Sequence, residues 1–242
     1  MPQTGKVFLT AEWRDLLLLN YQVDPAQLRA YVPPGTELDS FAGRTYLSLV
    51  GFRFCKTKYR SFFSIPFHSE FEEVNLRIYV RRSVSGEIRR GVAFIAEIVP
   101  SFVVAKAARW FYGENYVRRP IEHRVECAAT AKSIAYRWQE AAGWCELSAL
   151  FRGQPAHPQE GSLEQFISEH YWGYSGQKDG TSLEYRVDHV PWKIWTAWHA
   201  GFCGDASNLY GKELSAVLRN PPASAFVADG SLVTVYEGGK LT

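Results

Sequence analysis

The chain has 242 residues, of which 46% are hydrophobic and 21% charged, and its formal net charge at pH 7 is +2. This composition excludes a disordered polar chain. The length fits one large globular domain or two small ones, and one domain, residues 1–242, is the expected organisation. No long run of lysine and arginine is present, so we expect no binding to nucleic acid.

The cysteines and the hydropathy pattern indicate the cellular location of the protein and its contacts with metals and membranes. The four cysteines are widely spaced, with no CxxC pair and no histidine at metal-ligand spacing, and are expected to be reduced and mostly buried. No segment approaches the roughly eighteen apolar residues of a membrane span, and the first residues contain no apolar signal core. We therefore expect a cytoplasmic protein that holds no metal and contacts no membrane.

The first predicted elements surround a proline-rich turn. Asp24 and Pro25 are an N-cap and first-turn pair that predict a short helix. Residues 33–35, Pro-Pro-Gly, must end it. Residues 44–56 then alternate in hydropathy as a strand does, with an irregularity expected near Gly51.

The middle of the chain predicts two antiparallel pairs separated by a helix. Residues 70–82 and 91–99 predict a hairpin with a glycine-containing loop. Apolar side chains at helical spacing predict a helix over residues 102–111. Residues 122–139 and 144–152 alternate as a further pair of strands.

The C-terminal third begins with a helix signal. Ser162 and Gln165 form a capping box that predicts a helix through Tyr171, ended by Gly173. Further elements are predicted as strands over residues 183–190, 192–199 and 225–236 and as a helix over residues 208–218. The resulting nine or ten strands and four helices predict an α+β fold with a large, mostly antiparallel, barrel-like sheet.

Several unusual segments occur in a characteristic order along residues 12–236. They read Asn-Tyr-Gln-Val-Asp-Pro at 20–25, Phe-Ala-Gly-Arg-Thr-Tyr-Leu-Ser-Leu at 41–49, Glu-Val-Asn-Leu-Arg-Ile-Tyr-Val at 73–80, His-Val-Pro-Trp at 189–192 and Gly-Ser-Leu-Val at 230–233. In this order and spacing the chain resembles the YqjF-like family of uncharacterised conserved proteins, within the acetoacetate decarboxylase-like superfamily. The resemblance implies a cone-shaped, mostly antiparallel β-barrel with an interior pocket and a few peripheral helices.

The resemblance also has implications for the pocket. Acetoacetate decarboxylases form an imine through a lysine whose pKa is depressed by a neighbouring lysine and by burial. The positions that resemble this lysine pair fall near Tyr116 and Val117, so the resemblance implies that decarboxylation does not carry over. It further places Arg14 where the decarboxylases have an arginine near the substrate carboxylate, and Glu73 near one of their pocket glutamates.

Four polar residues alternate along one predicted strand: Glu73, Asn75, Arg77 and Tyr79. Their side chains must point to one face of the sheet, which either meets water or lines a polar side of a cavity. In a cavity, Glu73 and Arg77 are expected to pair, because a lone buried charge is costly. Arg14 also has two interpretations, a pocket arginine that binds a carboxylate or an ordinary exposed arginine.

His189 is the second catalytic candidate beside Glu73. It is either a general acid or base or a structural histidine that fixes the strand crossing before Pro191. Aromatic rings and one acid complete the expected ligand-binding set, which consists of Tyr112, Glu114, Tyr116, Tyr171, Tyr185 and Trp192.

Two functions remain open on the sequence. The first is a pocket that binds a small carboxylate or apolar metabolite without transforming it. The second is a cofactor-independent lyase or hydratase acting on a small oxo-acid, with Arg14 holding the carboxylate, Glu73 as acid or base, and His189 or a tyrosine assisting. An exposed sheet edge rich in aromatic residues is also compatible with a homodimer.

Overall fold

A computed structural model of the protein describes residues 5–60, 69–101, 115–128 and 131–241. Within these ranges the first strands and helices are β1 (Val7–Val23), α1 (Pro25–Leu28), the 3-10 helix η1 (Arg29–Tyr31), β2 (Glu37–Leu38), β3 (Thr45–Tyr59), β4 (Phe71–Val84), β5 (Glu87–Val99) and β6 (Tyr116–Arg118). They are followed by β7 (Ile121–Cys127), β8 (Lys132–Glu140), β9 (Gly143–Phe151), α3 (Leu163–Ser168), β10 (Trp172–Gly176), β11 (Ser182–His189), β12 (Ile194–Cys203), α4 (Ser207–Leu218), β13 (Ser224–Tyr236) and β14 (Gly239–Lys240).

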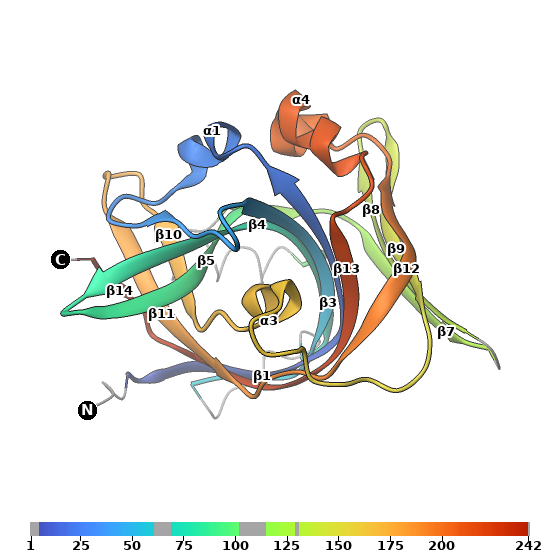
Figure 1. The fold of residues 1–242 in the computed structure, drawn as a ribbon, viewed down its shortest axis with the longest axis horizontal. Helices are drawn as coiled ribbons and strands as arrows, with labels where there is room; N and C mark the ends of the chain where they lie inside the picture. Colours follow the sequence, from blue (N-terminus) through green and yellow to red (C-terminus); the bar gives the residue numbers. More distant parts are fainter. Residues whose placement is uncertain (1–4, 61–68, 102–114, 129–130, 242) are drawn as a thin grey trace.

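Seven of these strands form a closed ring. Their order is β11-β10-β5-β4-β3-β1-β13, and the pairing of β11 with β13 closes it. Neighbours in the ring are antiparallel except for β10 and β5, which are parallel. Helix α3 lies inside the ring when it is viewed end-on, as Figure 1 shows. The mostly antiparallel α+β class predicted from the sequence is therefore confirmed, and its large sheet is ring-like.

Four further strands make a second layer outside the ring, and the short strands β2, β6 and β14 pair with β4, β5 and β11 of the ring. Strands β12, β9, β8 and β7 continue the sheet beyond β13, and in Figure 1 they lie to the right of the ring, while α1 and α4 lie along the top of the view. One apolar cluster fills the space between the layers and includes Trp138 and Tyr136 of β8. A second cluster, which includes Phe52 and Trp192, fills the ring interior.

The leucine run in β1 shows why the ring wall is buried on both sides. Leu17 and Leu19 belong to the outer cluster, whereas Leu16 and Leu18 belong to the inner one. Successive side chains of a strand point to opposite faces, so a continuous apolar run is what a strand between two cores requires.

The irregularity expected near Gly51 is present as a bulge between β1 and β3. Arg14 pairs with Arg53 and Leu17 with Gly51, so β1 has one residue more than β3 between these pairs. Asp15 at the bulge has a φ of 54°, and the Tyr136 hydroxyl donates to its carbonyl oxygen at 2.7 Å. A Cβ at position 51 would lie 2.6 Å from the Tyr136 ring, which explains the glycine.

Several predicted local signals are confirmed. The Asp24 side chain accepts a hydrogen bond from the Ala26 amide at 2.8 Å and caps α1. Strands β4 and β5 pair as the predicted hairpin. Its two turn residues, Ser85 and Gly86, have φ values of 50° and 85°, as a tight hairpin turn requires.

Other predicted elements differ from the structure. The single strand predicted over residues 122–139 is wrong: β7 and β8 are two strands, paired to each other from Ile121–Trp138 to Cys127–Lys132. At the Cys127–Lys132 end of this pair the Ala128 amide donates to the Ala131 carbonyl oxygen at 2.9 Å, and the sequence of residues 128–131 contains no glycine or proline. The described residues accordingly form fourteen strands, more than expected. The helix predicted over residues 102–111 lies outside the described residues.

The helix after Ser162 is shorter than predicted. The Ser162 hydroxyl accepts a hydrogen bond from the Gln165 amide at 3.2 Å, as the capping signal requires, but α3 ends at Ser168 rather than at Tyr171. Gly173 is not a helix stop. It lies in β10, and a Cβ there would be 2.0 Å from the Tyr185 ring, so the glycine allows β10 and the Tyr185 ring to pack closely.

The cysteines and the helices add two observations. Cys55 and Cys145 are free and buried as expected, whereas Cys127 and Cys203 are free but exposed, because they end strands at the margin of the second layer. No helix in the described ranges has the length and apolar character needed to cross a membrane.

Candidate functional site

The ring encloses a cavity of about 110 Å³. Most of its wall is apolar and aromatic, and the rings come from β1, β3, β4, β5, β10 and the segment before β12: Phe8, Trp13, Phe52, Phe54, Tyr59, Phe71, Phe94, Trp172 and Trp192. Polar side chains line the rest, namely Glu73, Asn75, Arg77, Glu97, Tyr116, Ser168, His170, Tyr185 and His189. An apolar hollow with a few convergent polar groups is the usual form of a small-molecule site.

The polar stripe predicted on β4 faces this cavity. Glu73, Asn75 and Arg77 all line it, while the alternating side chains Val74 and Leu76 pack in the outer cluster. Glu73 and Asn75 are each 2% exposed. Of the two interpretations of the stripe, the enclosed one therefore holds for these three residues.

Glu73 is held by neighbouring side chains of the stripe and of β6. Its Oε1 accepts a hydrogen bond from Asn75 Nδ2 at 3.0 Å, and its Oε2 accepts one from the Tyr116 hydroxyl at 3.3 Å. Glu97 lies opposite Asn75 in the β4–β5 pairing and opposite Tyr116 in the β5–β6 pairing. Two buried carboxylates thus belong to one polar row that crosses three strands.

The ion pair expected between Glu73 and Arg77 is not formed between these two described residues. Arg77 instead directs its Nη2 toward the Ile167 carbonyl oxygen of α3 at 3.4 Å, a long contact, and its guanidinium lies 5.7 Å from the centre of the Tyr79 ring. Its Nε is buried and makes no hydrogen bond within the described part of the chain. Arg77 therefore keeps donor capacity at the cavity wall.

Tyr79 is the fourth residue of the stripe, but it packs behind the residues that line the cavity. Its hydroxyl is 2.6 Å from Ser48 Oγ, and Ser48 in turn donates to Asn20 Oδ1 at 2.6 Å. Tyr79 is 1% exposed and is not among the described residues that line the cavity. The geometry gives Tyr79 a structural position, with its ring beneath Arg77.

His189 lies at the seam where the ring closes. It pairs with Val233 in the β11–β13 ladder, and its ring stacks on Trp192 with centroids 4.3 Å apart. Its Nδ1 is 2.9 Å from the Val190 carbonyl oxygen, which can only accept, so Nδ1 carries the proton. Burial lowers the pKa of His189 and favours the neutral imidazole, and Tyr171 packs on its other side at 4.9 Å.

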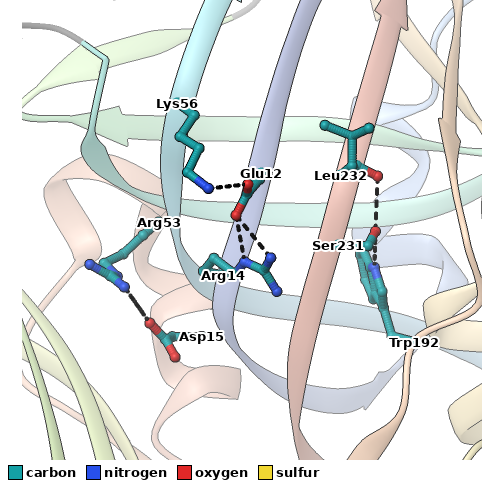
Figure 2. A network of polar contacts seen from close by, with 8 residues as sticks. All are labelled: Glu12, Arg14, Asp15, Arg53, Lys56, Trp192, Ser231 and Leu232. Atoms are coloured by element: carbon teal, nitrogen blue, oxygen red, sulfur yellow. Dashed lines mark hydrogen bonds and ion pairs between the residues drawn. The ribbon is translucent and has the colours of Figure 1, made fainter.

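The structure does not bring Arg14 into the cavity. Its guanidinium pairs with Glu12 at 2.8 Å, the Arg14 side chain is 41% exposed, and Lys56 shares the same carboxylate, as Figure 2 shows. Glu12 and Arg14 share one face of β1 and Trp13 takes the other, where it lines the cavity. The exposed interpretation of Arg14 is the one the geometry supports.

The other predicted site residues divide into three groups. Tyr116, Tyr185 and Trp192 line the cavity, and Trp192 is fixed by a 3.0 Å hydrogen bond from its Nε1 to Ser231 Oγ, drawn in Figure 2. Tyr171 lies behind His189 and is not among the described lining residues. The positions predicted for Tyr112 and Glu114 lie outside the described residues.

Sequence reasoning missed three polar groups of the cavity, Glu97, Ser168 and His170. Glu97 lies in an otherwise apolar run of β5, and a buried acid there was a usable signal. His170 follows α3 and reaches the cavity only because α3 lies inside the ring. Among the described residues no group of three or more histidines, cysteines and acids is placed to hold a metal ion.

Comparison with known proteins identifies the family. The family model DUF2071, described as "Uncharacterized conserved protein", matches residues 10–231. The chain is 26% identical over 193 residues to "Uncharacterized protein YqjF" of Bacillus subtilis (strain 168), a match that covers 76% of this chain and 74% of YqjF.

Solved structures show the same fold at low identity. The enduracididine biosynthesis enzyme MppR complexed with pyruvate has a TM-score of 0.70 and 14% identity, covering 100% of this chain and 92% of that one. Acetoacetate decarboxylase from Legionella pneumophila has a TM-score of 0.67 and 13% identity, covering 100% and 92%. The chain therefore belongs to the DUF2071 family of uncharacterised, YqjF-like conserved proteins and has the acetoacetate decarboxylase-like fold.

Proposed function

We propose that the ring cavity binds a small molecule with an apolar body and a carboxylate, such as a short 2-oxo acid. The observation that carries the proposal is Arg77, whose guanidinium lies at an apolar cavity wall. Among the residues that the structure describes, its Nε has no hydrogen-bond partner and its Nη2 makes one long contact. A buried guanidinium with spare donors is stabilised by an anion that accepts two parallel hydrogen bonds.

The surroundings of Arg77 favour a small ligand with a short apolar part. The cavity of about 110 Å³ is walled by aromatic rings, which contribute apolar contact on every side of the polar stripe. Low polarity also strengthens a guanidinium–carboxylate contact compared with the same contact in water. The fold neighbour whose structure holds pyruvate, MppR, supports this ligand class for the cavity.

Binding is proposed to be non-covalent. Tyr116 and Val117 stand where the resemblance to acetoacetate decarboxylases places the lysine pair, and neither side chain can form an imine. The Tyr116 hydroxyl is engaged with Glu73 at 3.3 Å. Arg77 takes the carboxylate-binding role that the sequence suggested for Arg14.

Titration calorimetry with pyruvate and 2-oxoisovalerate tests the proposal. We expect Arg77→Met to weaken binding of both acids by roughly tenfold or more, because a charge-assisted bidentate contact is lost. Arg81→Met is the matched control: Arg81 lies on the same strand and face but pairs with Glu37 at 2.9 Å at the surface. Equal affinity of wild type and Arg77→Met, or equal binding of the neutral amides of the acids, would contradict the proposal.

A second candidate, a cofactor-independent lyase or hydratase, is favoured by the position of Glu73. This carboxylate is 2% exposed, faces the cavity and is oriented by Asn75 and Tyr116, as a general acid or base must be. Proton NMR of pyruvate in D₂O measures the first step, in which a base removes a methyl proton and returns deuterium. Deuterium exchange that disappears in Glu73→Gln but persists in His189→Asn would assign the base to Glu73. An exchange rate no higher than in buffer would contradict the enzyme candidate and leave ligand binding as the proposed function.

A further inference from the structure

A buried histidine and aspartate lie at one end of the cavity and take no part in the site proposed so far. His170 lines the cavity, its side chain is 2% exposed, and its Nε2 lies 3.8 Å from Oδ2 of Asp39, whose side chain is 0% exposed. Neither ring nitrogen of His170 makes a hydrogen bond within the described ranges. A buried polar group requires a hydrogen-bond partner, and the described residues leave at least one nitrogen of this cavity-lining imidazole without one.

Asp39 is held rigidly behind the imidazole. Its Oδ1 accepts a hydrogen bond from the Ser40 amide at 2.9 Å, and its own amide donates to the Tyr79 carbonyl oxygen of β4 at 2.9 Å. Arg90 Nε lies 3.5 Å from Oδ2 and balances the charge. The carboxylate is therefore fixed beside Nε2, which leaves Nδ1 as the nitrogen available to a ligand.

His170 and Arg77 line the same cavity. Both lie beside the Tyr79 ring, with the His170 ring centroid at 4.8 Å and the Arg77 guanidinium at 5.7 Å from its centre. Phe166 also packs edge-on against the imidazole, with ring centroids 5.0 Å apart, and contacts the Tyr79 ring at 5.4 Å. We infer that His170 is a second polar contact for the ligand carboxylate beside Arg77, and that Asp39 is the positioning residue that fixes its imidazole; the inference rests on the proposed function.

The protonation of His170 gives this inference a measurable consequence. Burial lowers the pKa of His170, Arg77 and Arg90 lower it further, and Asp39 opposes them, so the neutral ring is favoured near pH 7. The Asp39 carboxylate beside Nε2 favours the tautomer that carries its proton on that nitrogen. An incoming carboxylate adds negative charge at Nδ1 and favours the imidazolium, whose Nδ1–H can then donate to it. Binding of a carboxylate should therefore take up a proton.

Calorimetry of pyruvate binding in two buffers of different ionisation enthalpy measures this uptake. Near pH 7.5 we expect wild type to take up a measurable fraction of a proton, and His170→Asn to take up none and to bind roughly tenfold more weakly. Asp39→Asn should bind more weakly and take up less, because it removes the charge that stabilises the imidazolium. His157→Asn, at an exposed position, should match wild type.

The outcomes separate this inference from the proposed function. Pyruvate binding that needs Arg77 but shows the same proton uptake in wild type and His170→Asn overturns the inference alone. No binding of pyruvate or 2-oxoisovalerate overturns both. Nitrogen NMR of the ligand-free wild type is independent of the variants' folding: a neutral His170 protonated on Nε2 supports the role of Asp39, and protonation on Nδ1 overturns it.

Discussion

At the residue scale, buried polar side chains in the ring are of two kinds: some hydrogen-bond to neighbouring strands, and others face the cavity. Asn20, Ser48, Tyr79 and Ser224 form one hydrogen-bonded chain across β13, β1, β3 and β4, with distances of 3.0, 2.6 and 2.6 Å. Each of these hydrogen bonds joins two neighbouring strands, so together they fix the register of β13, β1, β3 and β4. Arg77, by contrast, has one guanidinium nitrogen that no other described residue hydrogen-bonds. This difference separates structural polar residues from those available to a ligand.

The buried histidines make the stability of the protein depend on pH. Burial lowers the pKa of both His170 and His189 below the ordinary value of 6.5, so the unfolded chain binds protons that the folded protein excludes. The free energy of unfolding is therefore at its plateau above about pH 6.5 and falls as the pH drops below it, by on the order of 1 kcal/mol per histidine. Urea denaturation between about pH 7.5 and about pH 5.5 measures the slope.

Histidine variants test whether His170 and His189 cause this dependence of the free energy of unfolding on pH. His170→Gln and His189→Gln should each reduce the loss of stability on acidification, and the double variant should nearly abolish it in this range. His157→Gln, which removes an exposed histidine, should leave the slope unchanged. An unchanged slope in the double variant would show that other groups control the acid sensitivity.

At the element scale, α3 is a helix that the sequence predicts from its N-cap and that forms part of the cavity wall. The helix lies inside the ring, Phe166 and Ile167 are buried in the inner cluster, and the Ile167 carbonyl oxygen faces Arg77. A six-residue helix has little stability of its own, so its N-cap and its packing must hold it in place. The position of the cavity wall therefore depends on Ser162.

We expect Ser162→Ala to lower the free energy of unfolding by about 1 kcal/mol, because the hydrogen bond from the Gln165 amide to the hydroxyl is lost. Chemical denaturation measures the change. Ser162→Asp is the matched control, since aspartate caps as well as serine and should keep stability near that of wild type. Equal destabilisation by both variants would show that packing of the Ser162 side chain, and not the cap, is responsible.

The elements that could be predicted are those whose signal is local. The cap at Asp24, the hairpin of β4 and β5 and the polar stripe from Glu73 to Arg77 each depend on neighbouring residues, and the structure contains all three. The separation of β7 from β8 has no turn residue in the sequence, so one strand was predicted in place of two. Local pattern cannot detect a reversal that tertiary pairing imposes.

The candidate site could be predicted only in part for the same reason. Glu73 and Arg77 share one strand, and the period of a strand places both on one face. His170 and Asp39 are 131 positions apart in the chain and meet because α3 enters the ring and the segment after β2 packs on β4. Arg14 was assigned to the pocket by resemblance, yet alternation along β1 gives the inward position to Trp13.

On the scale of the whole molecule, the ring and the second layer share a core. The outer cluster combines Leu17 and Leu76 of the ring with Trp138 and Leu147 of the second layer. The sheet is also continuous from β13 into β12 and β9. Neither layer can expose its side of this cluster to water without a large loss of buried apolar area. The chain is therefore expected to unfold as one domain, residues 1–242, rather than as two.

Two tryptophans on the paired strands β8 and β9 test this cooperativity. Trp138 is 0% exposed between the layers, whereas Trp144 is 41% exposed. Trp138→Ala should lower the free energy of unfolding by about 3–5 kcal/mol, and Trp144→Ala by about 0.5 kcal/mol or less. If the layers unfold together, the Trp138→Ala transition shifts as a whole, and tryptophan fluorescence and far-ultraviolet circular dichroism give the same midpoint. A fluorescence transition that precedes the loss of strand signal would mean that the second layer detaches first, and that the ring is a folding unit of its own.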